Sequence, residues 1–140
     1  MDFGSAPDKK FSDNYQSGAL SFEIISNNKK LICNSGYFQN YKHQLNNISK
    51  TSASHITLII ANTSSVQFIK QPDGPTIINN KLEILDKKII SQKNHWSVSA
   101  SHNGYIKRFG IIHNRKIDFL HDNKKFIGID TILKKKKFKS

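Results

Sequence analysis

Short runs of β-branched and aromatic residues recur along the chain, and Asn, Gly, Ser or Lys interrupts them every few positions. Runs of this length and composition are typical of β-strands. The first half of the chain therefore predicts strands at Leu20 to Ile25, Lys30 to Asn34, Ile56 to Ala61 and Val66 to Ile69. Residues 37–54 are polar and have no helical periodicity, so they are expected to form a long connection.

The second half of the chain continues this pattern. It predicts five further strands, at residues 81–91, 95–102, 105–113, 116–120 and 126–133. Asn103-Gly104 stands between two of them and is the strongest hairpin signal in the chain, because such turns need residues that tolerate positive φ. Weaker turn signals lie at Asn27-Asn28, Gln71 to Pro75, Asn114-Arg115 and Asp122 to Lys124.

The predicted strands indicate the architecture. About eight or nine strands without a convincing amphipathic helix favour an all-β fold, an antiparallel β-sandwich. We expect one such domain at residues 18–133, between a connecting segment at 1–17 and a basic tail at 134–140. No apolar run is long enough to span a bilayer, and the first residues lack the basic and apolar regions of a secretory signal.

The formal net charge is +12, which would attract a polyanion by long-range steering. The basic residues are 20 Lys and 2 Arg, beside 20 Ile and 14 Asn. Lys, Ile and Asn share A/T-rich codons, so a genome-wide codon bias explains the charge without a dedicated partner. Arg is the residue preferred for bidentate recognition of phosphate, so its scarcity argues against a nucleic-acid site. The charge would still attract an acidic polysaccharide at low salt, and neither a nucleic acid nor a membrane is the expected partner.

Cys33 is the only cysteine, so neither an intrachain disulfide nor a cysteine-based metal site can form. Its neighbours Leu31, Ile32 and Asn34 belong to a predicted strand, which favours an inert, buried thiol. The chain also lacks a Gly-rich phosphate loop, a Gly-x-Ser-x-Gly motif and a His-Glu-x-x-His motif. The sequence therefore indicates neither a nucleotide nor a redox cofactor.

Three groups of short motifs follow one another along the chain. They are Gly18 to Glu23 with Leu31 to Gly36, Thr51 to Leu58 with Asn62 to Ser65, and Ser101 to Tyr105 with His113 to Arg115 and Gly128 to Asp130. Each motif is weak alone. Their order and spacing together resemble the C-terminal domain of heparinase II/III-like proteins.

The resemblance implies a larger parent protein. Full-length members of that family have a helical α/α toroid followed by β-sandwich sheets, and an acidic polysaccharide lies between them. They are polysaccharide lyases: a base removes the proton beside a uronic-acid carboxylate, the developing charge is neutralised, and the leaving oxygen is protonated. Most of the catalytic Tyr, His and Asn groups come from the toroid. The resemblance thus implies that this chain is inactive alone and has the toroid as a partner.

The zinc site implied by the resemblance is altered here. Similar proteins have His-x-His-x-Asp just before Leu-Ser-Phe-Glu, where this chain has Asn14 to Gly18. The first His, a candidate catalytic group, falls on Asn14, and the second, a candidate zinc ligand, on Gln16. A metal-binding carboxylate falls on Asn34 and another His ligand on His55, which is either a surviving ligand or a buried histidine bonded to backbone. Amide oxygens are poor zinc ligands, so we expect no cofactor and a hydrogen-bonded cluster of Gln16, Asn34 and His55.

The third group of motifs contains further candidates. His102 and Tyr105 flank the Asn-Gly pair and are weak catalytic candidates, because a Tyr–His pair could transfer a proton. Alternatively, Tyr105 packs on the sheet and His102 belongs to the turn. Arg115 could contact substrate, or it could form a structural ion pair with Asp118 or Asp130.

Three other residues are weak candidates for substrate binding. Trp96 could stack on a sugar ring, or it could be a core aromatic in a strand of alternating polarity. Lys107 and Arg108 could bind a uronate or a sulfate, although such pairs are usually solvated surface.

The sequence thus favours the C-terminal β-sandwich domain of a heparinase II/III-like polysaccharide lyase, which helps to close a cleft and position an acidic polysaccharide. Two alternatives stay open: a free-standing carbohydrate- or polyanion-binding β-module, and a structural remnant of a longer reading frame. The resemblance implies a bacterial protein of the cytoplasm or the periplasm, and the chain carries no address that distinguishes the two.

Overall fold

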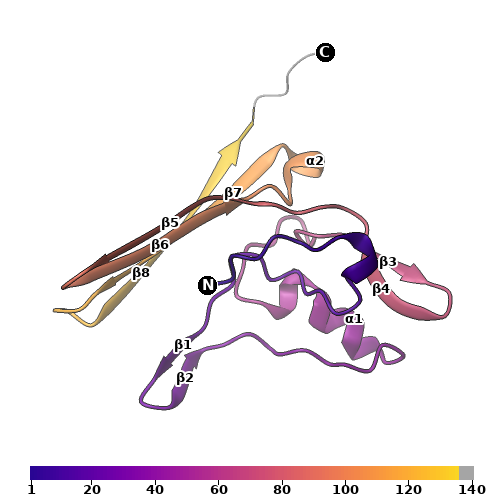
Figure 1. The fold of residues 1–140 in the computed structure, drawn as a ribbon, viewed down its shortest axis with the longest axis horizontal. Coiled ribbons are helices and arrows are strands. Elements are labelled where there is room, and N and C mark those ends of the chain that lie inside the picture. Colours follow the sequence, from indigo (N-terminus) through magenta and orange to yellow (C-terminus); the bar gives the residue numbers. More distant parts are fainter. Residues whose placement is uncertain (136–140) are drawn as a thin grey trace. The chain divides into compact units, whose positions relative to one another are not determined.

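The computed structural model describes residues 1–135 and divides the chain into two compact units (Figure 1). The first unit is Met1–Glu83, and the second begins at Ile84. Among the described residues, eight strands form three antiparallel sheets, accompanied by two short α-helices. The fold is therefore mostly β, as the strand pattern predicts, although the short helices were not expected.

The first unit is rich in loops and contains only short regular elements. In chain order these are η1 (Lys9–Phe11), β1 (Ile24–Ser26), β2 (Lys29–Ile32), α1 (Gln44–Lys50), η2 (Ser52–Ser54), β3 (Phe68–Gln71) and β4 (Gly74–Ile78). β1 pairs with β2 and β3 pairs with β4, each as an antiparallel hairpin. Both hairpins turn where the sequence predicts. In the first, Asn27 and Asn28 have φ of 49° and 59°, a conformation that asparagine tolerates well.

Two predicted strands of this unit are wrong in whole or in part. The run that starts at Leu20 becomes a strand only at Ile24, because Leu20 has a left-handed backbone with φ of 61° and is fully buried. Residues 56–61 form no strand. Their backbone forms irregular hydrogen bonds instead: the Ile56 N–H donates to Asn34 Oδ1 at 2.8 Å, and the Thr57 N–H donates to the His55 carbonyl at 2.8 Å.

Helix α1 lies inside the segment that was expected to be irregular, so that expectation is wrong. Its polarity is inverted: Asn46, Ser49 and Lys50 are buried, whereas Leu45 and Ile48 are 43% and 52% exposed. A helix with polar residues inside lacks the usual apolar stripe that identifies a surface helix from sequence. Tertiary hydrogen bonds hold it instead, as Asn46 Nδ2 donates to a carbonyl of the preceding loop at 2.6 Å.

Three buried serine hydroxyls join three loops of the first unit. Ser17 Oγ lies 3.0 Å from Ser52 Oγ and 2.8 Å from Ser65 Oγ. Ser52 Oγ also donates to the Ser17 carbonyl at 2.8 Å, and the Val66 N–H donates to Ser17 Oγ at 3.0 Å. Because these polar groups satisfy one another, they can replace apolar packing in this part of the core.

The second unit contains a four-stranded antiparallel sheet with strand order β5-β6-β7-β8 (Figure 1). Its elements are β5 (Ile84–Gln92), β6 (His95–His102), α2 (Ile106–Phe109), β7 (Ile111–Leu120) and β8 (Lys125–Lys134). The register places His102 opposite His113, and Arg115 opposite Asp130. Since side chains alternate between faces along a strand, these four lie on one face of the sheet.

Two turn predictions in the second unit are wrong. Asn103-Gly104 does not form a two-residue turn; the chain passes through α2, which ends at Gly110 with a left-handed φ of 66°. No break occurs at Asn114-Arg115, and β7 is continuous. Asn114 Nδ2 donates to Ser101 Oγ at 3.0 Å, so a residue typical of turns is used inside the sheet.

The turn between β7 and β8 falls at Asp122 to Lys124, as predicted. β8 includes Lys134, the first residue of the expected basic tail, and the Lys135 N–H donates to the Gly110 carbonyl at 2.8 Å. The remainder of that tail, 136–140, lies outside the described residues. Within residues 1–135, no helix is long and apolar enough to cross a membrane.

Cys33 is exposed, so the prediction of a buried thiol is wrong. β2 ends at Ile32, and three of its four residues are exposed. The apolar run in the sequence therefore does not correspond to a buried strand at this position.

Candidate functional site

A chain of polar side chains crosses the second unit from the end of β6 to β8. The Gly104 N–H donates to His102 Nδ1 at 3.1 Å. His102 Nε2 lies 3.1 Å from His113 Nδ1, and His113 Nε2 lies 2.7 Å from Asp130 Oδ1. Both histidines are fully buried. The turn that carries two catalytic candidates is thus connected to a carboxylate two strands away.

Arg115 completes this arrangement as the ion-pair partner of Asp130. Its Nε donates to Asp130 Oδ1 at 2.7 Å and its Nη2 to Asp130 Oδ2 at 2.9 Å, a bidentate geometry. Arg115 is buried, so its guanidinium is held within the sheet. Asp118, the other partner considered for Arg115, lies 2.8 Å from His95 Nε2 and 2.9 Å from Lys116 Nζ.

Burial determines the charge of the two histidines. It lowers the pKa of His102 to about 3, and the neighbouring His113 and Arg115 add to that effect. Burial also lowers the pKa of His113, against the influence of Asp130. For Asp130, burial alone would raise the pKa of the carboxyl, but hydrogen bonds from Arg115 and His113 hold that pKa below its usual value. At neutral pH both imidazoles are therefore neutral, and His113 lies beside the ionised carboxylate of Asp130.

Tyr105 is fully buried and lies next to His102, with ring centroids 5.6 Å apart. Its ring also approaches Phe109 of α2, at 6.1 Å between centroids. The structure thus brings the two catalytic candidates of this turn together, inside the packing of the second unit.

The positions that the resemblance implies as metal ligands lie in the first unit. Asn34 Oδ1 accepts the Ile56 N–H at 2.8 Å, so the amide oxygen already has a donor. A Cβ on Gly18 would lie 3.2 Å from the His55 ring, so Gly18 leaves room for that imidazole. Gln16 is two residues before Gly18 in the chain. Asn34 and His55 are therefore close to each other through Ile56, while Asn34 is committed to backbone.

His55 is half-buried, and its two ring nitrogens lie in different environments. Burial lowers the pKa of its imidazole, although a hydrogen bond to the Ser49 backbone and the Asp2 charge oppose that shift. Its Nε2 is buried and has no hydrogen-bond partner within residues 1–135. The same part of the chain contains no group of three His, Cys, Asp or Glu side chains that could hold a metal. One imidazole among amides does not fit a zinc site, which requires about four nitrogen, thiolate or carboxylate ligands.

Asn14, where the resemblance implies a catalytic histidine, is exposed. The Tyr37 hydroxyl donates to Asn14 Oδ1 at 3.1 Å and accepts from Asn46 Nδ2 at 3.0 Å. This contact links the loop before residue 17 to helix α1. An amide in this position can donate and accept hydrogen bonds but cannot act as a base near neutral pH.

The remaining substrate-binding candidates occupy two places on the second unit. Trp96 is half-buried and packs against Phe119 and Phe126, at 5.7 and 5.9 Å between ring centroids. Lys107 and Arg108 are exposed in α2.

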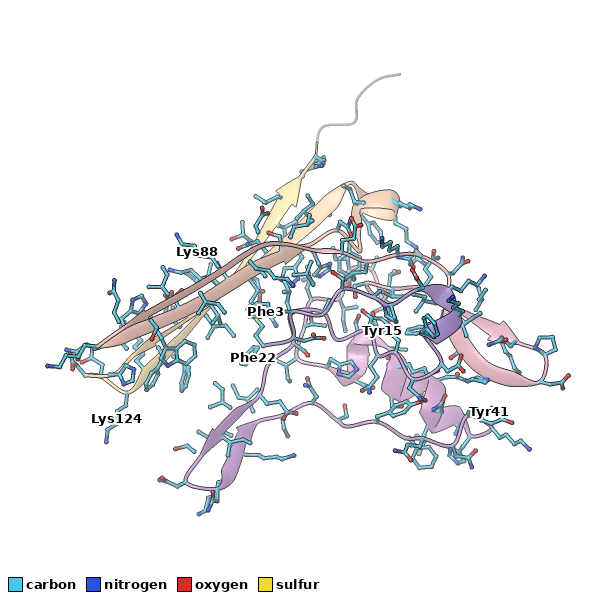
Figure 2. All side chains as sticks on the ribbon, viewed as in Figure 1. Phe3, Tyr15, Phe22, Tyr41, Lys88 and Lys124 are labelled. Atoms are coloured by element: carbon cyan, nitrogen blue, oxygen red, sulfur yellow. The ribbon has the colours of Figure 1, made fainter. Side chains whose placement is uncertain are left out.

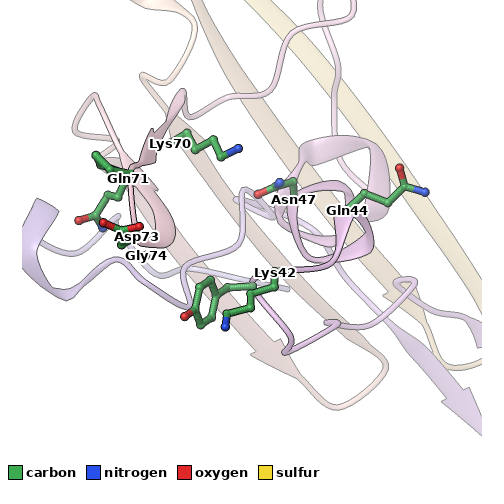
Figure 3. A pocket seen from close by; sticks show the side chains of 9 residues that line it. Lys42, Gln44, Asn47, Lys70, Gln71, Asp73 and Gly74 are labelled. Atoms are coloured by element: carbon green, nitrogen blue, oxygen red, sulfur yellow. The ribbon is translucent and has the colours of Figure 1, made fainter.

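Sequence reasoning missed a hollow in the first unit (Figure 3). It has a volume of about 570 Å³ and lies between the segment entering α1 and the β3–β4 turn. The residues that line it are Tyr41, Lys42, Gln44, Asn47, Lys70, Gln71, Pro72, Asp73 and Gly74. The signal available in the sequence was a Tyr-Lys pair beside amide residues, which the prediction of an irregular connection left unexplained.

Comparison with known proteins identifies the family. A family model described as Heparinase II/III-like, C-terminal, matches residues 1–139. Neither a curated protein nor a solved structure matches the chain. The family match covers both units, and it includes the segment 1–17 as well as the motif residues around His55, His102 and His113. The chain therefore belongs to the heparinase II/III-like C-terminal family.

Proposed function

We propose that this chain is the C-terminal β module of a polysaccharide lyase that cleaves uronic-acid-containing polysaccharide by β-elimination. In this proposal a helical toroid domain supplies the catalytic groups, and the β module helps to close the cleft and position the acidic chain. The same proposal includes a domain at residues 18–133, a connecting segment at 1–17, a tail at 134–140 and a sandwich arrangement of the sheets. The family match over residues 1–139 is the observation that carries it.

The chemistry of the described residues supports a non-catalytic role for the isolated chain. β-Elimination needs a base with access to the substrate proton and an acid for the leaving oxygen. His102 and His113 are fully buried and bonded to each other, and Asp130 is paired with Arg115. Asn14 stands where the resemblance implies a catalytic histidine. We therefore expect no lyase activity from this chain alone.

The inverted polarity of α1 supports a partner domain. Leu45 and Ile48 are exposed on α1, and with Phe38 they line a largely apolar hollow of about 350 Å³. Apolar side chains grouped on a surface commonly mark a contact with another protein or domain. In the proposal, this face of the first unit is covered by the helical domain of the parent lyase.

The test is an elimination assay with and without a helical domain. The purified chain is mixed with heparan sulfate, alginate or another uronan, and the ultraviolet absorbance of the unsaturated product is followed. We expect no turnover by the chain alone, and turnover when it is added to a family lyase that lacks its own C-terminal domain. Turnover by the chain alone would contradict the proposal, because it would require a complete catalytic set in these residues.

Two variants sharpen this assay. Ile48→Lys places a charge on the apolar face of α1 and is expected to weaken the rescue. Gln92→Lys adds the same charge to the exposed end of β5 in the second unit, outside both hollows, and should leave the rescue intact. Both positions are exposed, so neither substitution is expected to unfold the chain.

A second candidate function is a free-standing module that binds acidic carbohydrate. The net charge of +12 and the hollow beside α1 favour it. This candidate predicts saccharide binding without any rescue of a truncated lyase. The rescue assay therefore separates the two functions.

A further inference from the structure

We propose that the hollow between α1 and the β3–β4 turn, lined by Tyr41, Lys42 and Lys70, is a binding site for an acidic oligosaccharide. The inference rests on the part of the proposed function that makes an acidic polysaccharide the ligand, and it assigns that ligand a place on this chain. The site lies wholly within the first unit.

The chemistry of the lining fits a charged sugar. Tyr41 is 43% exposed and offers a ring face on which a pyranose can stack, and Figure 2 shows it at the edge of the first unit. Lys42 Nζ lies over the Tyr41 ring, 6.0 Å from its centre, so the cation and the aromatic ring form one surface for a ligand. The amides of Gln44 and Asn47 can both donate to and accept from hydroxyl groups. A ring, cations and amides together match a sugar that bears carboxylates.

The two lysines are available for a ligand. Neither Lys42 nor Lys70 forms an ion pair with a carboxylate among residues 1–135. Asp73 is the only acidic residue of the lining, so the lining has one more cation than anion. Figure 3 shows Lys70 on the β3 side of the hollow and Lys42 on the side that leads into α1. Cations on two walls can meet successive carboxylates along a uronan.

The walls of the hollow are held in place by buried contacts. Lys50, at the end of α1, is fully buried, and its Nζ donates to the Thr76 carbonyl on β4 at 2.8 Å and to the Asp13 carbonyl. Gln71 Nε2 donates to the Pro75 carbonyl at 3.0 Å and closes the β3–β4 turn. The helix and the hairpin are therefore fixed relative to each other before a ligand arrives, which reduces the entropy lost on binding.

The size of the hollow also fits. Ligand pockets in proteins usually enclose about 300–1,000 Å³. A volume of about 570 Å³ lies within that interval and is large enough for part of an oligosaccharide. The near absence of Arg from the chain, and its complete absence from the lining, argues against a site for phosphate recognised by bidentate contacts.

The test is a calorimetric titration of the full chain with a tetrasaccharide of galacturonic acid, and with the corresponding neutral galactose oligomer. The double variant Lys42→Gln/Lys70→Gln is compared with Lys87→Gln/Lys124→Gln, which removes the same charge from exposed positions of the second unit. In Figure 2, Lys124 extends from the β7–β8 turn. We expect the first pair to weaken uronate binding about tenfold and the control pair less than about twofold.

A third variant tests the stacking surface. Tyr41→Ala removes the ring without changing the charge, and it should weaken binding of both the acidic and the neutral oligomer. Equal weakening by the two lysine pairs would overturn the proposed site, because it would mean that the net charge of the chain alone attracts the uronate. Lack of uronate binding by the unmodified chain would also overturn it.

The outcome is separable from that of the elimination assay. Rescue of a truncated lyase without any effect of Lys42→Gln/Lys70→Gln on binding would reject this site and leave the proposed function intact. Site-specific binding without rescue would reject the lyase module and favour the free-standing carbohydrate-binding module.

Discussion

His102 Nε2 lies 3.1 Å from His113 Nδ1, and both imidazoles are fully buried. Because the Gly104 N–H donates to His102 Nδ1, the proton of neutral His102 must be on Nε2. His102 therefore donates to His113 Nδ1, and the proton of His113 must be on Nε2, where it is donated to Asp130. One backbone N–H thus determines the tautomers of two histidines and the direction of the whole chain of hydrogen bonds.

Replacement of His113 should destabilise the second unit. His113→Ala leaves the His102 Nε2–H buried without an acceptor and opens a cavity between β6 and β8. We expect a loss of about 2–4 kcal/mol in the free energy of unfolding, measured by urea denaturation. His121→Ala removes an exposed imidazole whose ring centre lies 4.7 Å from that of Phe119, and it should change this free energy by less than about 1 kcal/mol. Equal effects of the two substitutions would argue against the hydrogen-bonded chain.

Stability should fall in mild acid because of His102. Its folded-state pKa of about 3 lies below the ordinary value of 6.5, so the unfolded chain binds the proton more readily between those two pH values. Stability from this group is complete above about pH 6.5 and is lost as pH falls towards 3, by about 1.4 kcal/mol per pH unit. Burial lowers the pKa of His113 and adds an effect of the same sign.

The measurement is urea denaturation at a series of pH values, repeated with His102→Gln. The variant lacks the titrating group, so its stability should fall less steeply in the same interval. The lowered pKa of Asp130 acts in the same direction in more acidic solution, because a carboxylate with a lowered folded-state pKa loses its contribution as pH falls. A pH profile that is identical for the two proteins would contradict the assignment to His102.

Lys50 should contribute to the stability of the first unit through its buried ammonium group. Lys50→Met preserves much of the side-chain volume but leaves the Asp13 and Thr76 carbonyls without their donor. We expect a loss of about 1–3 kcal/mol in the free energy of unfolding. Lys30→Met, at an exposed position of β2, removes the same charge and is the control. An unchanged stability of Lys50→Met would mean that water satisfies those carbonyls.

The β1–β2 turn offers a stabilising substitution. Asn28 has φ of 59°, and glycine adopts that conformation without steric cost. Asn28→Gly creates an Asn-Gly pair and should raise the free energy of unfolding by a few tenths to about 1 kcal/mol. Ser26→Gly lies within β1 and should lower stability instead, because glycine gains freedom in the unfolded chain. Thermal denaturation of both variants provides the measurement.

The predictions from sequence were most successful where local preference and tertiary structure agree. The Asn27-Asn28 turn is correct because asparagine favours the left-handed backbone that the hairpin needs. Strand β6 has the predicted bounds, since apolar Trp96, Val98 and Ala100 alternate with serine along the run. Local signals failed at Asn103-Gly104, where α2 replaces the expected two-residue turn.

In the candidate site, too, the sequence indicates residues whose contacts only the tertiary structure reveals. The motifs of the sequence include both His102 and His113, but a linear sequence does not reveal that the two imidazoles are bonded to each other. Arg115 was assigned two possible acidic partners, and the β7–β8 register decides for Asp130 because it places the two residues directly opposite. The hollow beside α1 could not be predicted, since its walls come from segments more than twenty residues apart, Lys42 and Lys70 among them.

By itself, the sequence determined a mostly β chain and its resemblance to the heparinase II/III-like family, together with amides at Asn14, Gln16 and Asn34, where that resemblance implies imidazole or carboxylate. These properties depend only on residue type and order, which the sequence gives directly. Only the tertiary structure decided which polar groups are buried, which partners they bond to, and where a ligand could enter. Inverted polarity in α1 and the pairing of His102 with His113 depend on contacts between distant segments, and such contacts have no local pattern in the chain.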